Sequence, residues 1–142
     1  MVAYSFKARF AAPILAGTKA QTIRAERAGR SRHDRPGEQL QLFTGMRTRA
    51  CRRLATPTCI AVTPIRMAFS GPMACDLIAL EGVHLVPSSM ARFARADGFE
   101  TVADMAAFWA AEHPGIEEFR GVLIRWQPLD PADALDIAAR AA

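Results

Sequence analysis

Short segments of alternating apolar and polar residues run through the chain, and this period of two is typical of half-buried β-strands. The first segment begins at Tyr4, where Tyr4, Phe6, Ala8 and Phe10 alternate with polar or charged residues. By this pattern and by turn residues, strands are predicted over residues 4–10, 18–24, 40–44 and 119–126. Two more short strands are predicted between residues 46 and 65, split by Pro57 and Pro64.

Capping residues and apolar spacing near 3.6 residues predict four helical segments. These are a short turn over residues 13–16, a helix capped by Ser88 or Ser89 that runs through Arg95, a helix that starts at a Thr101–Asp104 capping box and ends before Pro114, and an alanine-rich helix over residues 130–140. Strands therefore dominate, with two or three helices beside them. The predicted fold class is α+β, built as a small barrel.

With 142 residues, no internal repeat and no linker, the chain is expected to form a single domain over residues 1–142. Nine side chains are predicted to form its core: Phe6, Phe10, Leu40, Leu42, Ile60, Phe108, Trp109, Val122 and Ile124. Three cysteines, Cys51, Cys59 and Cys75, lack metal-binding or disulfide spacing and are expected to be buried thiols of a cytoplasmic protein. No stretch is long and apolar enough to predict a membrane span.

Charge divides the chain into two unlike halves. Residues 1–66 hold thirteen Lys and Arg against three acids, a net charge of +10, whereas residues 67–142 hold five Arg against eleven acids, a net charge of −6. Residues 25–36 form a predicted loop whose arginines are Arg27, Arg30, Arg32 and Arg35. Such a basic half favours an anionic partner such as RNA, although a solvated arginine-rich surface explains the charge equally well.

One segment, residues 17–24, concentrates groups that could do chemistry. On an extended chain Thr22 and Arg24 project from one face, and Lys19 can join them across a turn. An ammonium, a hydroxyl and a guanidinium together suit an anion or a polarised carbonyl, with Lys19 as base or electrostatic partner and Thr22 as nucleophile or donor. The same three residues are also compatible with an ordinary exposed strand.

The segment Gly17-Thr18-Lys19-Ala20-Gln21-Thr22-Ile23-Arg24 resembles the G-x-K-x-x-T-x-R signature of the ASCH family, named for activating signal cointegrator homology. Further segments resemble the family in the same order over about residues 4–127, and they leave only the C-terminal helix outside. They are residues 6–15, 36–42, where Glu38 replaces the usual Asp, 45–51, 97–109 and 121–126. The resemblance implies a PUA-like mixed β-barrel with two to three peripheral helices.

The resemblance also implies a function. Family members bind RNA or nucleotides in a basic cleft, and some small members resemble amidohydrolases that remove the acetyl group of N4-acetylcytidine. Carried over, Lys19 is the base, Thr22 the nucleophile and Asp97 the acid, with Glu100 as a competitor because the family has Glu where this chain has Asp97. For RNA or a modified nucleoside, binding residues would be Arg24, Arg47 and the loop arginines Arg27, Arg30, Arg32 and Arg35.

Two other functions remain open on the sequence, a non-catalytic RNA-binding module and a metal-independent ribonuclease, since a fold does not fix a reaction. Arg47 and Arg49 are expected to share one face of a strand and so to extend an RNA-binding surface. The three histidines are scattered and lie near no cysteine cluster, so neither a metal nor a cofactor is expected. The sequence does not indicate an oligomeric state.

Overall fold

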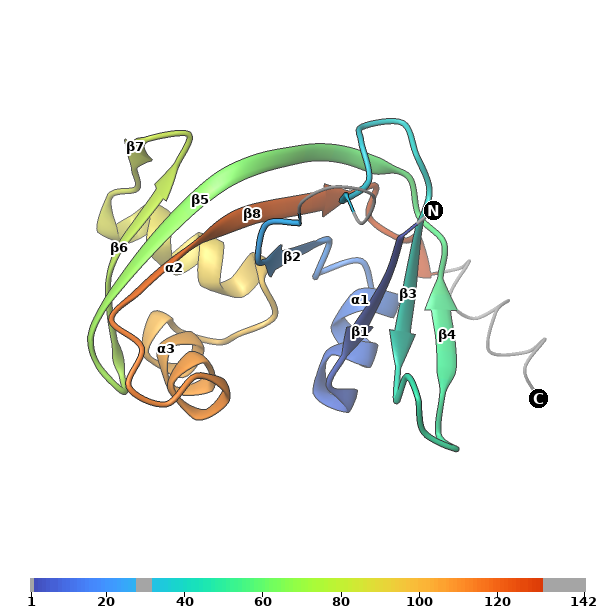
Figure 1. Cartoon of the computed structure of the whole chain (residues 1–142), viewed down its shortest axis with the longest axis horizontal. Coiled ribbons are helices and arrows are strands. Elements are labelled where there is room, and N and C mark those ends of the chain that lie inside the picture. The colour runs from blue at the N-terminus through green and yellow to red at the C-terminus, as the bar shows by residue number, and fades with distance from the viewer. Residues whose placement is uncertain (1, 28–31, 132–142) are drawn as a thin grey trace.

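The computed structural model of the chain describes residues 2–27 and 32–131 (Figure 1). Its elements are β1 (Val2–Phe6), a 3₁₀ turn η1 (Ala8–Phe10), α1 (Ala11–Leu15), β2 (Gln21–Arg24), β3 (Leu40–Thr44), β4 (Arg52–Ala55), β5 (Cys59–Gly71), β6 (Ala74–Leu80), β7 (Val83–His84), α2 (Pro87–Ala96), α3 (Val102–Glu112) and β8 (Glu118–Trp126). The predicted alanine-rich helix lies outside the described residues from residue 132 onward.

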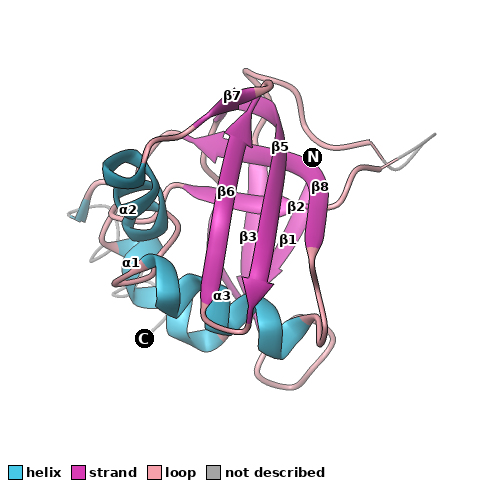
Figure 2. Cartoon of the chain, turned by 90° about the vertical axis from the view of Figure 1, so that its left-hand side faces the viewer, coloured by secondary structure: helices cyan, strands magenta, loops and turns pink. Residues whose placement is uncertain are grey.

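The described strands form two sheets, so the predicted α+β class is confirmed. One sheet has the order β1-β3-β4, with β1 parallel to β3, and the other has the order β2-β8-β5-β6-β7 with antiparallel pairs. β5 and β8 arch from the side of α2 and α3 across to the three-stranded sheet (Figure 1). α3 packs against β6 and α2, while α1 packs against β4. Figure 2 shows the antiparallel run of β8, β5 and β6 face on.

The segment between β4 and β5 holds the two sheets together. Leu40 N–H donates to the Pro57 carbonyl at 2.8 Å and Cys59 N–H to the Glu38 carbonyl at 2.7 Å, which fixes the segment beside β3. Gln127 N–H donates to the Thr58 carbonyl at 2.8 Å, which fixes it to the end of β8. The same few residues therefore belong to both sheets and set the position of one sheet against the other.

The first predicted strand ends earlier than its alternating pattern suggests. β1 stops at Phe6, and residues 8–10 form a 3₁₀ turn in which Phe10 N–H donates to the Lys7 carbonyl at 3.0 Å. Phe10 is still buried, because the turn returns its ring to the core side. Alternation over residues 4–10 therefore records the burial of Tyr4, Phe6 and Phe10 correctly, but Ala8 is exposed and the pattern spans two kinds of backbone.

Of the two short strands predicted between residues 46 and 65, the first is confirmed as β4, but the second is much longer than predicted. β4 ends before Pro57, but β5 continues through Pro64 as one 13-residue strand. The Pro64 carbonyl accepts from Glu81 N–H at 2.9 Å, and the ladder between β5 and β6 begins only at Ile65. The nitrogen of Pro64 thus lies on the edge of β5 that faces β6, but before the first residue pair of the two strands. A backbone N–H would have no partner in the sheet at that position.

Ile60 is the clearest error in the predicted core, because 49% of it is exposed. Cys59 is paired with Trp126 and Ala61 with Arg125, so Ile60 is the extra residue of a β-bulge and turns outward. Phe108 is only half buried, while the other seven predicted core residues are buried. Cys59 and Cys75 are buried thiols as expected, but Cys51 is exposed in the turn before β4.

The helix starts differ in how well sequence signals located them. Thr101 caps α3, as predicted, by accepting a hydrogen bond from Asp104 N–H at 3.0 Å. α2 instead begins at Pro87 with Val86 at its N-cap, so neither Ser88 nor Ser89 caps it. Proline suits the first helical position because its missing N–H would have no partner there. No helix in residues 2–27 and 32–131 is long and apolar enough to span a membrane.

Candidate functional site

The Lys19 side chain is held inside the protein between α1 and β2. Gly17 ends the α1 turn with φ near +80°, and the N–H groups of Thr18 and Lys19 both donate to the Pro13 carbonyl at 3.1 Å. Only 3% of Lys19 is exposed, and its Nζ lies 4.8 Å from the centre of the Phe10 ring. This ammonium position is therefore fixed by backbone turns and by an aromatic wall.

Asp97, at the C-terminal end of α2, meets Lys19 from across the fold. Lys19 Nζ lies 2.6 Å from the Asp97 backbone oxygen and 3.5 Å from Asp97 Oδ1, and Gln21 Nε2 donates to the same Oδ1 at 3.2 Å. Asp97 is 5% exposed. Gly98, with φ near +99°, allows the sharp turn after it, where an added Cβ would lie about 3 Å from Phe10 and from Lys19 Cδ.

Thr22 and Arg24 lie on one face of β2, as the alternation of the strand predicts. Arg24 Nε donates to Thr22 Oγ1 at 3.0 Å, and Arg24 Nη2 donates to the Ser5 carbonyl at 2.8 Å. The guanidinium carbon also lies 5.0 Å from the centre of the Phe6 ring. Because Thr22 Oγ1 accepts from a cation, negative charge on that oxygen is stabilised and its own proton remains available to donate.

Burial acts on the ionisable groups of the site in one sense, toward neutral forms. It lowers the pKa of the Lys19 amine, an effect that the charge of Asp97 opposes and that of Arg24 reinforces. Burial also raises the pKa of the Asp97 carboxyl, against the opposing influence of Lys19 and Gln21. Loss of hydration disfavours a charged amine and a charged carboxylate alike. Burial therefore disfavours the charged form of each group, and the attraction between the two charges opposes it.

A cleft of about 650 Å³ opens over these groups and is lined by Lys19, Thr22, Arg24 and Asp97. Its remaining wall is mainly aromatic and contains Phe6, Phe10, Phe99, Phe108, Trp109 and Phe119. The Phe10 ring meets the rings of Phe99 and Phe108 edge to face at 5.5 and 5.4 Å. Lys7 and Glu112 also line the cleft and form an ion pair at 3.4 Å. A flat, partly apolar molecule with a polar end fits such a cavity.

Glu100, the competitor for the role of the acid, is exposed and does not line the cleft. Its backbone N–H donates to Asp104 Oδ2 at 3.4 Å, which ties it to the start of α3. Arg47 lies in the turn between β3 and β4, next to Met46, which does line the cleft. The prediction that Arg47 and Arg49 share a strand face is wrong, because both lie in that turn.

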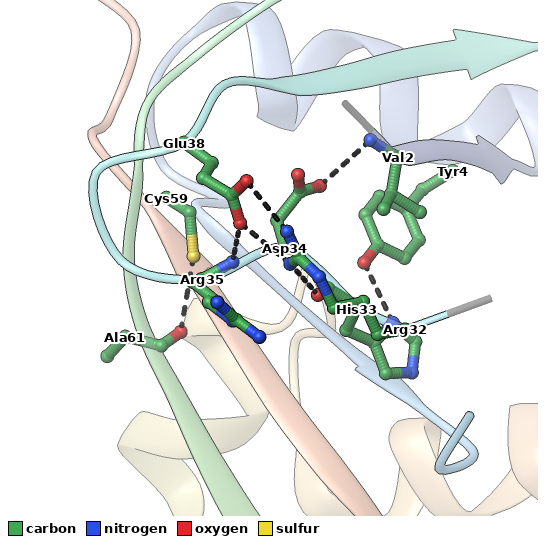
Figure 3. A network of polar contacts seen from close by, with 9 residues as sticks. All are labelled: Val2, Tyr4, Arg32, His33, Asp34, Arg35, Glu38, Cys59 and Ala61. Atoms are coloured by element: carbon green, nitrogen blue, oxygen red, sulfur yellow. Dashed lines mark hydrogen bonds and ion pairs between the residues drawn. The ribbon is translucent and has the colours of Figure 1, made fainter. Parts of the chain in front are cut away.

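The basic loop is partly fastened to the three-stranded sheet, as Figure 3 shows. Arg32 forms a two-pronged ion pair with Glu38 at 2.8 and 3.1 Å, which lowers the pKa of Glu38 to about 2. Arg27 lies over the Tyr4 ring at 5.5 Å, Arg35 is exposed, and Arg30 lies outside the described residues. The buried Asp34 accepts a hydrogen bond from Val2 N–H at 3.1 Å.

Sequence reasoning missed Gln21 and most of the aromatic wall. Strand alternation places Gln21 on the face of β2 opposite Thr22. Nothing in the nearby sequence indicates that the Gln21 side chain contacts Asp97. Helical spacing with Met105 predicted Phe108 and Trp109 as core residues, one of which could also border the cleft, and in the structure both line it.

In residues 2–27 and 32–131, no three His, Cys, Asp or Glu side chains come together in a way that could hold a metal ion. Comparison of the chain with protein-family models, with curated proteins and with solved structures found no match. Membership of the ASCH family stays a prediction from the motifs.

Proposed function

We propose that the cleft binds a cytidine-type nucleoside acylated on its exocyclic amine and hydrolyses that amide. The observation that carries the proposal is the buried Lys19–Asp97 contact beside the Thr22–Arg24 pair, all four in one aromatic-walled cleft. These are the positions that resemblance to the ASCH amidohydrolases assigns to base, acid and nucleophile, with Arg24 as the signature arginine. A substrate amide would meet all three reacting groups from one side.

We also propose that the chain is an ASCH-family protein with a PUA-like barrel. Two features of the fold support this. The signature residues lie on β2 and just before it, at the edge of the five-stranded sheet. Residues 57–59 hydrogen-bond to both sheets, and a connection of this kind would join the two sheets of a barrel along one side.

Binding in this proposal relies on the aromatic wall. Any pyrimidine ring can stack on the face of a Phe or Trp side chain. Such stacking contributes about 1–3 kcal/mol per base. The cleft volume of about 650 Å³ lies within the range of small-molecule sites. Stacking of the base would leave its acylated amine to meet Lys19, Thr22 and Asp97.

Acylation of Thr22 is the first chemical step. Thr22 Oγ1 attacks the acyl carbonyl carbon while the neutral Lys19 amine takes the hydroxyl proton, and the Arg24 guanidinium stabilises the charge that develops on the threonine oxygen. The C–N bond of the amide then breaks, and Asp97 gives its proton to the departing cytidine amine. The products of this step are cytidine and an acyl-threonine ester.

Hydrolysis of the ester restores the site. Water attacks the acyl carbon and gives one proton to the Asp97 carboxylate, while Lys19 returns to Thr22 the proton that it took. The carboxylic acid leaves, and Lys19, Thr22 and Asp97 regain their starting protonation states. A neutral lysine beside a protonated carboxyl is the state that burial favours at this site.

The decisive experiment incubates the purified protein with N4-acetylcytidine and separates cytidine and acetate by chromatography. The wild type and Thr63→Val should release both products, because Thr63 lies in β5 away from the cleft. Thr22→Val should release neither while it still binds the nucleoside. Wild-type protein that binds N4-acetylcytidine but releases nothing would leave a binding module and refute the hydrolase.

A further inference from the structure

The β3–β4 hairpin carries four arginines, two in its turn and two on β4. Arg47, Arg49, Arg52 and Arg53 are all exposed, and none of their side chains forms a hydrogen bond or ion pair with any residue in 2–27 or 32–131. Two other surface arginines differ, since Arg9 pairs with Asp104 and Arg120 with Glu118, whereas the side chain of the exposed Arg95 also has no partner in residues 2–27 and 32–131. The sequence contains no acid between Glu38 and Asp76, so the hairpin brings no countercharge of its own.

The backbone that presents these arginines is held in a fixed shape. Hydrogen bonds of Thr48 hold the turn. Its N–H and its hydroxyl both donate to the Gly45 carbonyl, at 3.0 and 2.6 Å, and the hydroxyl accepts from Ala50 N–H at 3.2 Å. Arg47 adopts a left-handed φ of 67°, which costs conformational energy in a residue with a side chain. The guanidinium groups therefore project from an ordered turn.

A phenylalanine lies beside Arg53 on the outer face of the same sheet, whereas Arg52, its neighbour in β4, projects to the other face. Leu42 is buried, so its neighbour Phe43 points to the opposite face, where it is half exposed and does not join the core cluster. Phe43 is in register with Ser5 on β1 and with Arg53 on β4. An accessible ring next to a guanidinium combines a surface for base stacking with a contact for phosphate.

This surface continues directly from the cleft. Gly45 and Met46, at the start of the hairpin turn, line the cleft, and so does Ser5, the cross-strand neighbour of Phe43. A chain that leaves the cleft past Ser5 and Met46 thus comes to the strand that carries Phe43 and to the turn that carries Arg47 and Arg49.

We infer that the hairpin surface, defined as Phe43, Arg47, Arg49 and Arg53, binds a single-stranded polynucleotide whose modified base enters the cleft. Its arginines contact phosphates and Phe43 stacks on a flanking base. The choice of RNA rests on the proposed ribonucleoside function, whereas the polyanion surface itself does not. The substrate class thereby becomes an acylated cytidine within an RNA strand.

The test measures fluorescence anisotropy of a labelled single-stranded 12-nucleotide RNA at several salt concentrations. Each phosphate contact contributes about 0.7 to the slope of log affinity against log salt for single strands. The doubles Arg47→Gln/Arg49→Gln and Arg49→Gln/Arg53→Gln should each lower the slope by about 1.4. Arg92→Gln/Arg95→Gln removes the same charge from exposed positions on α2 and should leave the slope unchanged.

Phe43 gives an independent arm of the test. Phe43→Leu keeps an apolar side chain but removes the ring, and should weaken RNA binding by roughly five-fold or more without altering the salt slope. Equal losses in hairpin and α2 doubles would show unspecific charge attraction and overturn the inference, as would tighter binding of DNA than of RNA of the same sequence.

The inference and the proposed function can fail separately. If the wild type releases cytidine from the free nucleoside but the hairpin doubles bind RNA as the wild type does, only the hairpin inference is refuted. If the hairpin doubles lose RNA affinity while the wild type never hydrolyses N4-acetylcytidine, the RNA surface stands and the hydrolase is refuted.

Discussion

At the scale of single residues, Tyr4 shows how one hydrogen-bond chain fixes protonation. Tyr4 Oη lies 2.8 Å from His33 Nδ1, and His33 Nε2 lies 2.7 Å from the Ala25 carbonyl oxygen. A carbonyl can only accept, so Nε2 carries a proton, and the Nδ1 of a neutral ring accepts from the tyrosine hydroxyl. Burial raises the pKa of Tyr4 to about 12, with the charge of Asp34 adding to it.

Tyr4 is the only tyrosine of the chain, so ultraviolet absorbance of the phenolate reports this group alone. After a rapid jump to alkaline pH, the folded protein should titrate near 12, whereas the urea-unfolded chain should titrate near 10.0. The folded state holds the proton more tightly, so this group stabilises the fold below pH 10. The contribution, roughly 3 kcal/mol, is lost as the pH rises to 12. A folded-state midpoint near 10 would contradict the buried hydrogen bond.

Lys19 and Asp97 should be energetically coupled, because each is the other's main polar partner in a buried place. Removing one partner leaves the other unsatisfied, whereas removing both relieves that cost. Lys19→Met with Asp97→Asn should therefore destabilise the protein by about 1–3 kcal/mol less than the two single changes summed. Urea denaturation of the four proteins of the cycle measures this difference.

The exposed pair Lys7–Glu112 serves as the control cycle for that measurement. Its side chains are 63% and 38% exposed, so Lys7→Met with Glu112→Gln should show a coupling below about 1 kcal/mol. Strictly additive effects at Lys19 and Asp97 would show that the two groups do not depend on each other.

At the scale of helices and strands, α3 and α2 begin by different means, and this difference can be measured. Thr101→Ala should lower the free energy of unfolding by about 1 kcal/mol, because the Asp104 N–H loses its acceptor. Ser88→Ala should change it by less than ~0.5 kcal/mol, since Pro87 rather than a serine starts α2. Chemical denaturation of both variants measures the two changes in the free energy of unfolding. Equal changes would contradict the assigned caps.

Local patterns located most elements but not the pairing that shapes them. The strands β2, β3 and β8 and the cap of α3 followed from alternation and from one capping motif, which act within a few residues. The length of β5 and the outward turn of Ile60 depend on where β6 stops pairing and where β8 is bulged. Those partners lie far along the chain, so the sequence near Pro64 carries no sign of them.

The candidate site likewise has a part that the local sequence predicts and a part that depends on a distant segment of the chain. Lys19, Thr22 and Arg24 are close in sequence, and a short strand places them at one cleft. Asp97 reaches Lys19 across 78 residues of chain, so residue spacing could not show their contact. The motif resemblance did name Asp97, although its role as an acid remains a prediction.

At the scale of the whole molecule, the charge halves of the sequence become two sides of the fold. The basic half builds β1 to β4, and the acidic half builds α2, α3 and β6 to β8. Figure 1 shows the blue to green three-stranded sheet on one side and the yellow to orange helices on the other. Such a separation orients an approaching polyanion toward the hairpin side and away from the helices.

The account depends most on neutral Lys19 and protonated Asp97 acting as base and acid in amide hydrolysis. The pH dependence of kcat/KM for N4-acetylcytidine reports both groups in the free protein. The rate should rise with pH as Lys19 loses its proton and fall again as Asp97 loses its own.

Asp97→Asn provides the comparison that assigns the two limbs of this profile. The falling limb should disappear, because the titrating acid is gone. The rising limb should keep its position, because Asp97 is protonated, and therefore uncharged, over the pH range in which Lys19 loses its proton. A flat wild-type profile, or a wild-type protein that hydrolyses nothing at any pH, would contradict the account.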